Sequence, residues 1–409
     1  MASESLRRPY VYELDPLRVV TAFCVVAVHV LGFTLGLNQD DIGVWIQNAF
    51  VTIFHFTRYV FMFVTAFALV YVYAGKQFST KSFWIKRGVA ILLPYSIWSV
   101  IYTIWNASSL SPLPLLQNSI LNILTGSASF QLYYILLTIQ FYILFPLFLL
   151  FIKRVAHHPW IVLGISFIIE MAVLYFDFYI LRLGPLRLTP TGKFIIQYQD
   201  RFVLIYQFYF VLGGLTALYL PQIRAFLMRS GQWVIASAIV GLTILLLNYT
   251  FQVLIYHQPA TAVLQPSIGF FSLIVIVFAF WLAYRWALST DEQGHPKGHH
   301  FWHTLSDASF GLYLIHALTL GMALRWMVPF LPVAWPVVVR VLLTYLVTAG
   351  SGILLSIFFM KTPFLSRLVG RIHPSQRKAP SPTPAQPIAK LQPETSEAKR
   401  VEASSLRSR

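Results

Sequence analysis

The sequence predicts an all-α polytopic membrane protein with about ten transmembrane helices. Of the 409 residues, 57% are hydrophobic and only 11% are charged, whereas soluble domains carry about 25% charged residues. Aromatic residues account for 16% of the chain, which suits helices whose ends lie in the aromatic belts of a bilayer. A helix needs about 20 mostly apolar residues to cross the hydrocarbon core, and such stretches recur along most of the sequence.

The predicted spans follow one another from the start of the chain. They cover residues 14–36, 46–74, 85–106, 131–152, 159–178, 203–221, 233–255, 267–286, 308–328 and 336–360. Residues 107–130 are too polar for a span, and within them 113–124 predict a short amphipathic or re-entrant helix. From about residue 373 the chain is rich in proline, serine, alanine and charged residues, a composition that cannot bury a core. We therefore predict a membrane domain over 1–372 and a disordered cytoplasmic tail over 373–409.

The basic residues predict that both termini are cytoplasmic. With the N-terminus inside, the loops rich in lysine and arginine fall on one side, as the positive-inside rule requires. One predicted outer loop, residues 179–202, departs from this pattern because it carries Arg182, Arg187, Lys193 and Arg201. Binding of an anionic or sugar-phosphate substrate would explain the departure, and so would simple tolerance.

The net charge of +16 does not indicate nucleic-acid binding, because the basic residues are spread over short loops. The single cysteine, Cys24, excludes an internal disulfide. Four histidines, His295, His299, His300 and His303, cluster after the eighth span. No cysteine accompanies them, so we predict a solvated, weakly basic loop and no metal site.

The candidate site residues are ionisable groups inside the spans. The first span carries Asp15 and Arg18 near its start and His29 deep in its apolar run. A helix turns about 100° and rises about 1.5 Å per residue, so Arg18 and His29 lie within about 20° of one face and about 16 Å apart along the axis. Ionisable groups at membrane depth are costly and by default indicate function. The alternative is that Arg18 reaches the headgroups and His29 only bonds to a neighbouring helix.

Two further basic groups, His55 and Arg58, lie three positions apart on the second span. In the predicted orientation they and His29 lie toward the outer half, so the three can share one cavity. His316 starts from the cytoplasmic side and is expected at a shallower depth. A neutral histidine accepts a proton from a hydroxyl, and an arginine stabilises a phosphate, a carboxylate or an oxyanion. This combination suits acyl transfer to an alcohol and suits peptide hydrolysis poorly.

Several segments, taken together and in order, resemble integral-membrane acyltransferase family 3. They are Arg18 and His29 with ten residues between them, Phe83-Trp84-Ile85-Lys86-Arg87, Pro94-Tyr95 with Trp98-Ser99, Leu132-Tyr133-Tyr134 with Gln140-Phe141-Tyr142, Tyr209-Phe210 with Gly213-Gly214, and Ser309-Phe310-Gly311-Leu312-Tyr313-Leu314-Ile315-His316. The chain departs from the family pattern at Thr65-Ala66-Phe67, where Ser-Gly-Phe is usual, and at Gln131, where a histidine is expected. The resemblance covers roughly residues 10–365. His55 and Arg58 resemble a variant of the family pattern that is seen in members from Gram-positive bacteria.

The resemblance implies a bacterial plasma-membrane enzyme that moves an acyl group, most simply acetyl, from cytoplasmic acyl-CoA (acetyl-CoA) to an acceptor hydroxyl. The acceptor is expected to be a surface polysaccharide or a lipid-linked sugar, with membrane lipids around the protein and no metal or nucleic acid. The resemblance implies that Arg18 orients the donor and that His29 is the general base or acyl carrier.

The remaining site residues are assigned to the two substrates. Asp15, Lys86 and Arg87 are expected on the donor side, and His55 and Arg58 on the acceptor side. His316 is either part of the site or a helix-contact residue, and both interpretations stay open.

A rival interpretation is an exporter of surface glycans, in which the same polar track conducts a substrate instead of modifying it. No internal repeat is evident, which weakens a reading based on the repeats of transporters. Loss of Arg18 or His29 would stop acylation in an enzyme and export in a carrier.

Overall fold

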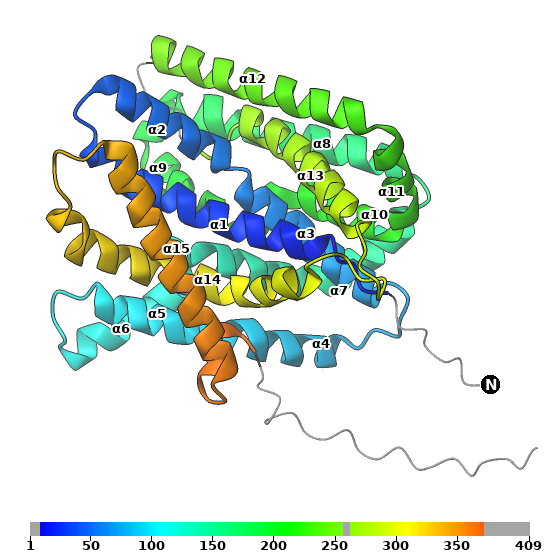
Figure 1. The fold of residues 1–409 in the computed structure, drawn as a ribbon, viewed down its shortest axis with the longest axis horizontal. Coiled ribbons are helices and arrows are strands. Elements are labelled where there is room, and N and C mark those ends of the chain that lie inside the picture. Colours follow the sequence, from blue (N-terminus) through cyan, green and yellow to red (C-terminus); the bar gives the residue numbers. More distant parts are fainter. Residues whose placement is uncertain (1–8, 257–261, 372–409) are drawn as a thin grey trace, which may run out of the picture. The chain divides into compact units, whose positions relative to one another are not determined.

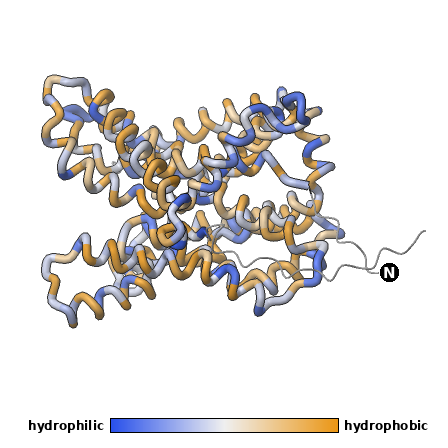
Figure 2. Tube along the Cα trace, turned by 60° about the horizontal axis from the view of Figure 1, so that its bottom comes forward, coloured by the Kyte–Doolittle hydropathy of each residue, from blue (hydrophilic) through white to orange (hydrophobic). Residues whose placement is uncertain are grey.

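The computed structural model describes residues 9–256 and 262–371, and in these ranges it is built from helices without a strand. Nine of the described helical stretches are long and apolar enough to cross a membrane, and one bent pair brings the number to ten. Figure 2 shows hydrophobic residues along the helices and many hydrophilic ones in their connections. The predicted all-α membrane fold is therefore confirmed. The tail predicted over 373–409 lies outside the described residues, and the cytoplasmic placement of the termini stays a prediction.

The first half of the chain forms seven α-helices and two short helical segments. They are α1 (Leu14–Phe33), η1 (Leu35–Leu37), α2 (Asp41–Phe54), α3 (Thr57–Tyr73), α4 (Thr80–Arg87), η2 (Gly88–Leu92), α5 (Leu93–Trp105), α6 (Pro112–Thr125) and α7 (Tyr133–Val155). The short helix predicted over 113–124 is α6, and its leucines at 113, 116 and 124 are exposed.

The second half begins with shorter elements and ends with long helices. They are α8 (Pro159–Tyr175), η3 (Phe176–Arg182), η4 (Pro185–Leu188), α9 (Pro190–Tyr198), η5 (Gln199–Arg201), η6 (Val203–Tyr206), α10 (Gln207–Leu218), α11 (Leu220–Arg229), α12 (Gly231–Tyr256), α13 (Pro266–Ala287), α14 (His299–Trp326), η7 (Val328–Phe330), α15 (Val337–Lys361) and η8 (Leu365–Val369). Helix α1 packs against α2, α3, α13, α14 and α15 and so lies among other helices for most of its length (Figure 1).

The second predicted span, 46–74, consists of two helices. Helix α2 ends at Phe54 and α3 begins at Thr57, so regular hydrogen bonding is interrupted at His55 and Phe56. Together they cover 33 residues, more than the roughly 20 that a straight span requires. His55 therefore lies at a helix end, and Arg58 lies in the first turn of the next helix.

The third span contains a π-helical segment, η2, that the hydrophobic pattern does not reveal. Pro94 has no N–H to bond the carbonyl of Ala90, and its ring crowds the preceding turn. A wider π turn is one of the ways in which a helix accommodates such a defect. Trp98 then donates from Nε1 to the Leu368 carbonyl at 2.9 Å, which holds the C-terminal η8 against α5.

The sixth predicted span, 203–221, is the second half of a bent pair. Helix α10 begins only at Gln207, and the segment 190–201 precedes it at an angle of 59°. The predicted loop 179–202 is therefore largely helical, a correction to the sequence reading. Charged and amide residues lower the hydropathy of residues 190–201, so the hydropathy pattern does not reveal this helix. Its start is nevertheless signalled by Pro190 and by the N-cap Thr189. The Thr189 hydroxyl accepts a hydrogen bond from Gly192 N at 3.0 Å.

Polar side chains stabilise the break between the two halves. Gln140 donates to the Arg201 carbonyl at 2.7 Å and accepts from Val203 N at 3.3 Å. The buried Glu170 accepts from Phe208 N in the first turn of α10 at 3.3 Å. Backbone groups freed at membrane depth need such partners, and a carboxylate is favoured at a helix N-terminus.

Candidate active site

Three arginines line a cavity of about 380 Å³ at the end of the bundle where α1 begins. Arg18 comes from α1, Arg87 from α4, and Arg371 follows η8, so segments far apart in the chain meet here. Asp307 of α14 is the one acidic residue among the described lining residues, and it is paired with Arg371. Guanidinium groups bind phosphates and carboxylates with two parallel hydrogen bonds, so this inner cavity is suited to an anion.

The positions of two of these arginines follow from local packing. The guanidinium carbon of Arg87 lies 5.6 Å from the centre of the Tyr142 ring, a cation–π distance. Arg371 follows Gly370, whose φ is +69° and whose site leaves no room for a side chain. A Cβ there would lie 2.5 Å from the carbonyl oxygen of Ala90. Arg371 is not among the site residues predicted from the sequence, yet it lines this cavity.

A second, central cavity of about 40 Å³ is lined by His29, His55 and Arg58, so the three groups expected to share a cavity do so. Arg58 lies 5.2 Å from the centre of the Tyr133 ring and donates to the hydroxyl of Tyr206 at 3.5 Å. These contacts, with an aromatic face and a hydroxyl, hold the guanidinium group of Arg58 at the wall of the central cavity.

His316 lies deeper than expected, against His29. The centres of the two imidazole rings are 5.4 Å apart and their planes are 25° from parallel. The expectation of a shallower depth was wrong because α14 begins at His299, whereas the predicted span began at residue 308. His316 Nδ1 lies 2.7 Å from the Tyr313 carbonyl, and since a carbonyl only accepts, Nδ1 carries the proton. Nε2 is then a buried acceptor, and it has no hydrogen-bond partner among the described residues.

Three aromatic residues, Phe61, Tyr134 and Tyr313, line both the inner and the central cavity. Their rings therefore form a common wall between the arginines and His29. Tyr134 and Tyr313 belong to segments that resemble the acyltransferase family, yet their role did not follow from the sequence. For Phe61, the one indication in the sequence of a place near the site is its position one helical turn after Arg58.

A third cavity, of about 390 Å³, lies at the other end of α1. Its lining includes Phe33, Trp105, Asn106, Ser129 and Phe130. The Phe130 ring, centred 4.3 Å from the His29 ring, lies between this outer cavity and His29. This cavity was not predicted from the sequence, because much of its wall comes from helix ends and from the loop between α6 and α7.

Asp15 and Lys86 are not among the residues that line these cavities. The buried Asp15 accepts from the Tyr10 hydroxyl, with both carboxylate oxygens at 2.9 Å. Burial, together with the Asp15 carboxylate, raises the pKa of Tyr10, so this phenol stays protonated and donates. Lys86 is exposed on α4. The donor-binding roles expected for both residues stay predictions.

Three of the four histidines predicted to lie in a loop, His299, His300 and His303, belong to the first turns of α14, which corrects the sequence prediction. The histidine cluster contacts the N-terminal segment. His295 Nδ1 lies 2.9 Å from the Tyr12 hydroxyl, and His303 Nδ1 lies 3.5 Å from the Asp15 carboxylate. Within residues 9–256 and 262–371, no three histidine, cysteine, aspartate or glutamate residues are placed to hold a metal ion.

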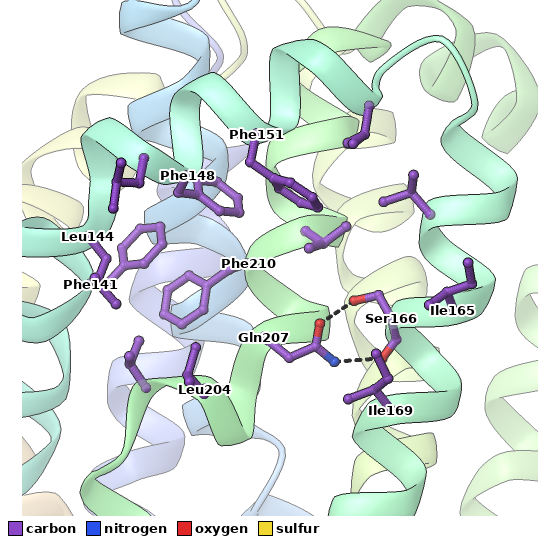
Figure 3. A pocket seen from close by; sticks show the side chains of 15 residues that line it. Phe141, Leu144, Phe148, Phe151, Ile165, Ser166, Ile169, Leu204, Gln207 and Phe210 are labelled. Carbon is purple, nitrogen blue, oxygen red and sulfur yellow. Dashed lines mark hydrogen bonds between the residues drawn. The ribbon is translucent and has the colours of Figure 1, made fainter.

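A further cavity, of about 510 Å³, lies between α7, α8 and α10 and is lined by none of the predicted site residues. Figure 3 shows its phenylalanine, leucine and isoleucine lining, with one polar pair at the side. In that pair Ser166 donates to the Gln207 side chain at 2.5 Å, and Gln207 donates back to the Ser166 carbonyl at 2.6 Å. Because its polar groups are paired with each other, this cavity offers no group for acyl transfer.

Comparison with known proteins identifies the chain's relatives. A family model described as an acyltransferase domain matches residues 11–360. A Bacillus subtilis (strain 168) protein, provisionally named the membrane-bound acyltransferase YfiQ, is 26% identical over 380 residues, which are 90% of this chain and 96% of the relative. No solved structure matches the chain.

Proposed function

This chain belongs to integral-membrane acyltransferase family 3, and on that premise we propose that it moves an acetyl group from acetyl-CoA to a hydroxyl of a surface polysaccharide or lipid-linked sugar. The observation that carries the proposal is the order of the three cavities along α1. An arginine-lined cavity, a histidine-lined cavity and an uncharged aromatic cavity follow one another from one end of that helix to the other.

The inner cavity is the proposed donor site. Coenzyme A carries several phosphates, and Arg18, Arg87 and Arg371 offer three guanidinium groups to them. Arg18 and His29 are separated by about 16 Å along a helix axis, a distance that an extended pantetheine arm covers. Phosphates bound beside Arg18 would therefore bring the thioester to His29.

His29 is the proposed general base. The acceptor oxygen attacks the thioester carbonyl while its proton passes to a ring nitrogen of His29. Arg58, in the same cavity, stabilises the negative charge that develops on the carbonyl oxygen. When the C–S bond breaks, His29 returns the proton to the thiolate, so the products are an ester and free coenzyme A. His316, stacked on His29, is proposed to hold that ring in place.

The outer cavity is the proposed acceptor site. Aromatic faces such as those of Trp105 and Phe130 pack against the apolar faces of sugar rings, and amide and hydroxyl groups such as those of Asn106 and Ser129 bond to sugar hydroxyls. In this proposal the inner cavity faces the cytoplasm, where acyl-CoA is found and where the positive-inside rule puts the basic loops. The enzyme would then work in the bacterial plasma membrane.

The proposal is tested with the full chain purified in lipid nanodiscs. We expect it to transfer radiolabelled acetyl from acetyl-CoA to envelope polymer extracted from the source cells, and we expect Arg18→Ala and His29→Ala to lose this transfer. His157→Ala, which changes an exposed histidine, is the matched control. Retention of full transfer by His29→Ala would contradict the assignment. Loss of polymer export with acetylation unchanged would favour the exporter instead.

A further inference from the structure

The wall between the inner and central cavities is closed by three rings in mutual contact. The ring centres of Tyr134 and Tyr313 are 5.6 Å apart, those of Phe61 and Tyr134 5.8 Å, and those of Phe61 and Tyr313 6.4 Å. Aromatic side chains at such separations are packed together. A group that passes from the arginines to His29 must therefore displace at least one ring.

Phe61 is the one ring of the three that has no hydrogen-bonding atom. The Tyr313 hydroxyl donates to the backbone carbonyl of Gln131, and its ring also lies 5.7 Å from that of His316. Phe61 has no polar atom and is only partly buried. Rotation of Phe61 therefore opens the wall without breaking a hydrogen bond.

The space beyond the wall is small. The central cavity measures about 40 Å³, about a tenth of the volume of the inner and outer cavities. A short acyl group such as acetyl therefore suits it better than a longer chain does. Val25 and Val28 of α1 also line this cavity.

Resting on the proposed function, we propose that Phe61, with Tyr134 and Tyr313, sets the length of the acyl chain that this enzyme transfers. Phe61 gives way to the thioester arm, and the acyl group enters the central cavity beside His29. A chain longer than acetyl meets α1 and keeps the carbonyl carbon away from the acceptor oxygen. The chemistry is the same for every chain: the C–S bond breaks, the C–O bond forms, and the hydroxyl proton ends on the thiol.

The test compares coenzyme A, acetyl-CoA, propionyl-CoA and butyryl-CoA on the full chain in nanodiscs. One methylene in an apolar pocket changes kcat/KM by about 10- to 200-fold, so the wild type should transfer butyryl far more slowly than acetyl. We expect Phe61→Ala to raise the butyryl-to-acetyl ratio of kcat/KM by at least about tenfold. It should still bind coenzyme A, because Arg18, Arg87 and Arg371 are intact.

A second variant enlarges the same cavity from helix α1. Val28 lines the central cavity and not the inner one, so Val28→Ala should shift the ratio in the same direction even if Phe61→Ala does not fold. Val28→Phe, which fills the cavity, should abolish acetyl transfer while coenzyme A still binds. Phe251→Ala is the matched control, since Phe251 is 58% exposed on α12 and lines none of these cavities.

The two proposals fail differently. If coenzyme A binds and acetyl is transferred, but neither Phe61→Ala nor Val28→Ala changes the chain-length ratio, the aromatic wall does not select the acyl group. If the wild type binds no coenzyme A at all, the proposed donor site is wrong and this inference is wrong with it.

Discussion

The cavities at the two ends of α1 are nearly equal in volume, about 380 and 390 Å³, and differ in charge. The inner cavity is lined by three arginines, whereas none of the described residues lining the outer cavity is charged. Size therefore does not distinguish the two substrates, but charge does. A phosphate-rich donor is favoured at one end and a neutral, hydroxyl-bearing acceptor at the other.

His29 lies between the two cavities, and its loss should have the largest effect. A positioned general base contributes about 10²- to 10⁴-fold to rate, so His29→Ala should lower kcat by that factor. The affinities for coenzyme A and for the acceptor should be unchanged, because His29 lines neither the inner nor the outer cavity. Single-turnover transfer, measured beside coenzyme A binding and with His157→Ala as control, checks this. A large loss of coenzyme A affinity in His29→Ala would contradict the separation of the two sites.

Arg18→Ala should weaken donor binding next most strongly. A hydrogen bond to a charged group contributes about 1.5–3 kcal/mol, so the affinity for coenzyme A should fall about 10- to 100-fold. Arg18→Lys should recover only part of the lost affinity, because a lysine ammonium cannot form the two parallel hydrogen bonds of a planar guanidinium group. Calorimetry at two salt concentrations measures the effect. Arg325→Ala removes an arginine that lies over Trp105 at the outer end, and it should leave donor affinity unchanged.

Gly370→Ala tests how Arg371 reaches the inner cavity. A left-handed conformation costs an alanine about 1–2 kcal/mol, and the new methyl group would collide with the Ala90 carbonyl. We expect Arg371 to shift and coenzyme A affinity to fall by about tenfold, the lower end of the range for a hydrogen bond to a charged group, because Arg371 is also paired with Asp307. Gly164→Ala, where a Cβ meets nothing within 4 Å, is the control. Equal affinities in the two variants would show that Arg371 does not contact the donor.

Trp105→Ala should have the smallest effect and only at the outer end. Aromatic contacts contribute about 0.5–1.5 kcal/mol beyond their buried area, so KM for the acceptor polymer should rise about two- to tenfold. Donor affinity should not change. Trp233→Ala, which removes a tryptophan that is 79% exposed on α12, controls for general loss of stability. A fall in coenzyme A affinity in Trp105→Ala would mean that donor and acceptor ends are not separate.

Much of the fold was predictable because a lipid environment demands long apolar helices. The alignment of Arg18 and His29 followed from helix geometry alone, and the shared cavity of His29, His55 and Arg58 followed from counting residues along the spans. The bent pair of α9 and α10 was not predictable in this way. Residues 190–201 are too polar to be recognised as part of a span by hydropathy. The polar partners that satisfy them lie on other helices.

The missed parts of the candidate site depend on contacts between distant segments. Arg371 reaches the inner cavity only because η8 packs on α5, and nothing near residue 371 signals that contact. His316 was misplaced because polar residues at the start of α14 concealed where the helix begins. The outer cavity depends on how several helix ends meet, which no single segment encodes.

The short α10 also has a consequence for how the protein is made. Its 12 residues extend about 18 Å, little more than half of a hydrocarbon core of about 30 Å. Such a half-helix cannot remain stably in lipid with an uncovered N-terminus. Gln140 bonds to the segment just before α10, Ser166 to the Gln207 side chain, and Glu170 to Phe208 N. All three precede α10 in the chain, so they leave the ribosome first. We therefore expect α7 and α8 to be inserted before α10 is stable in the membrane.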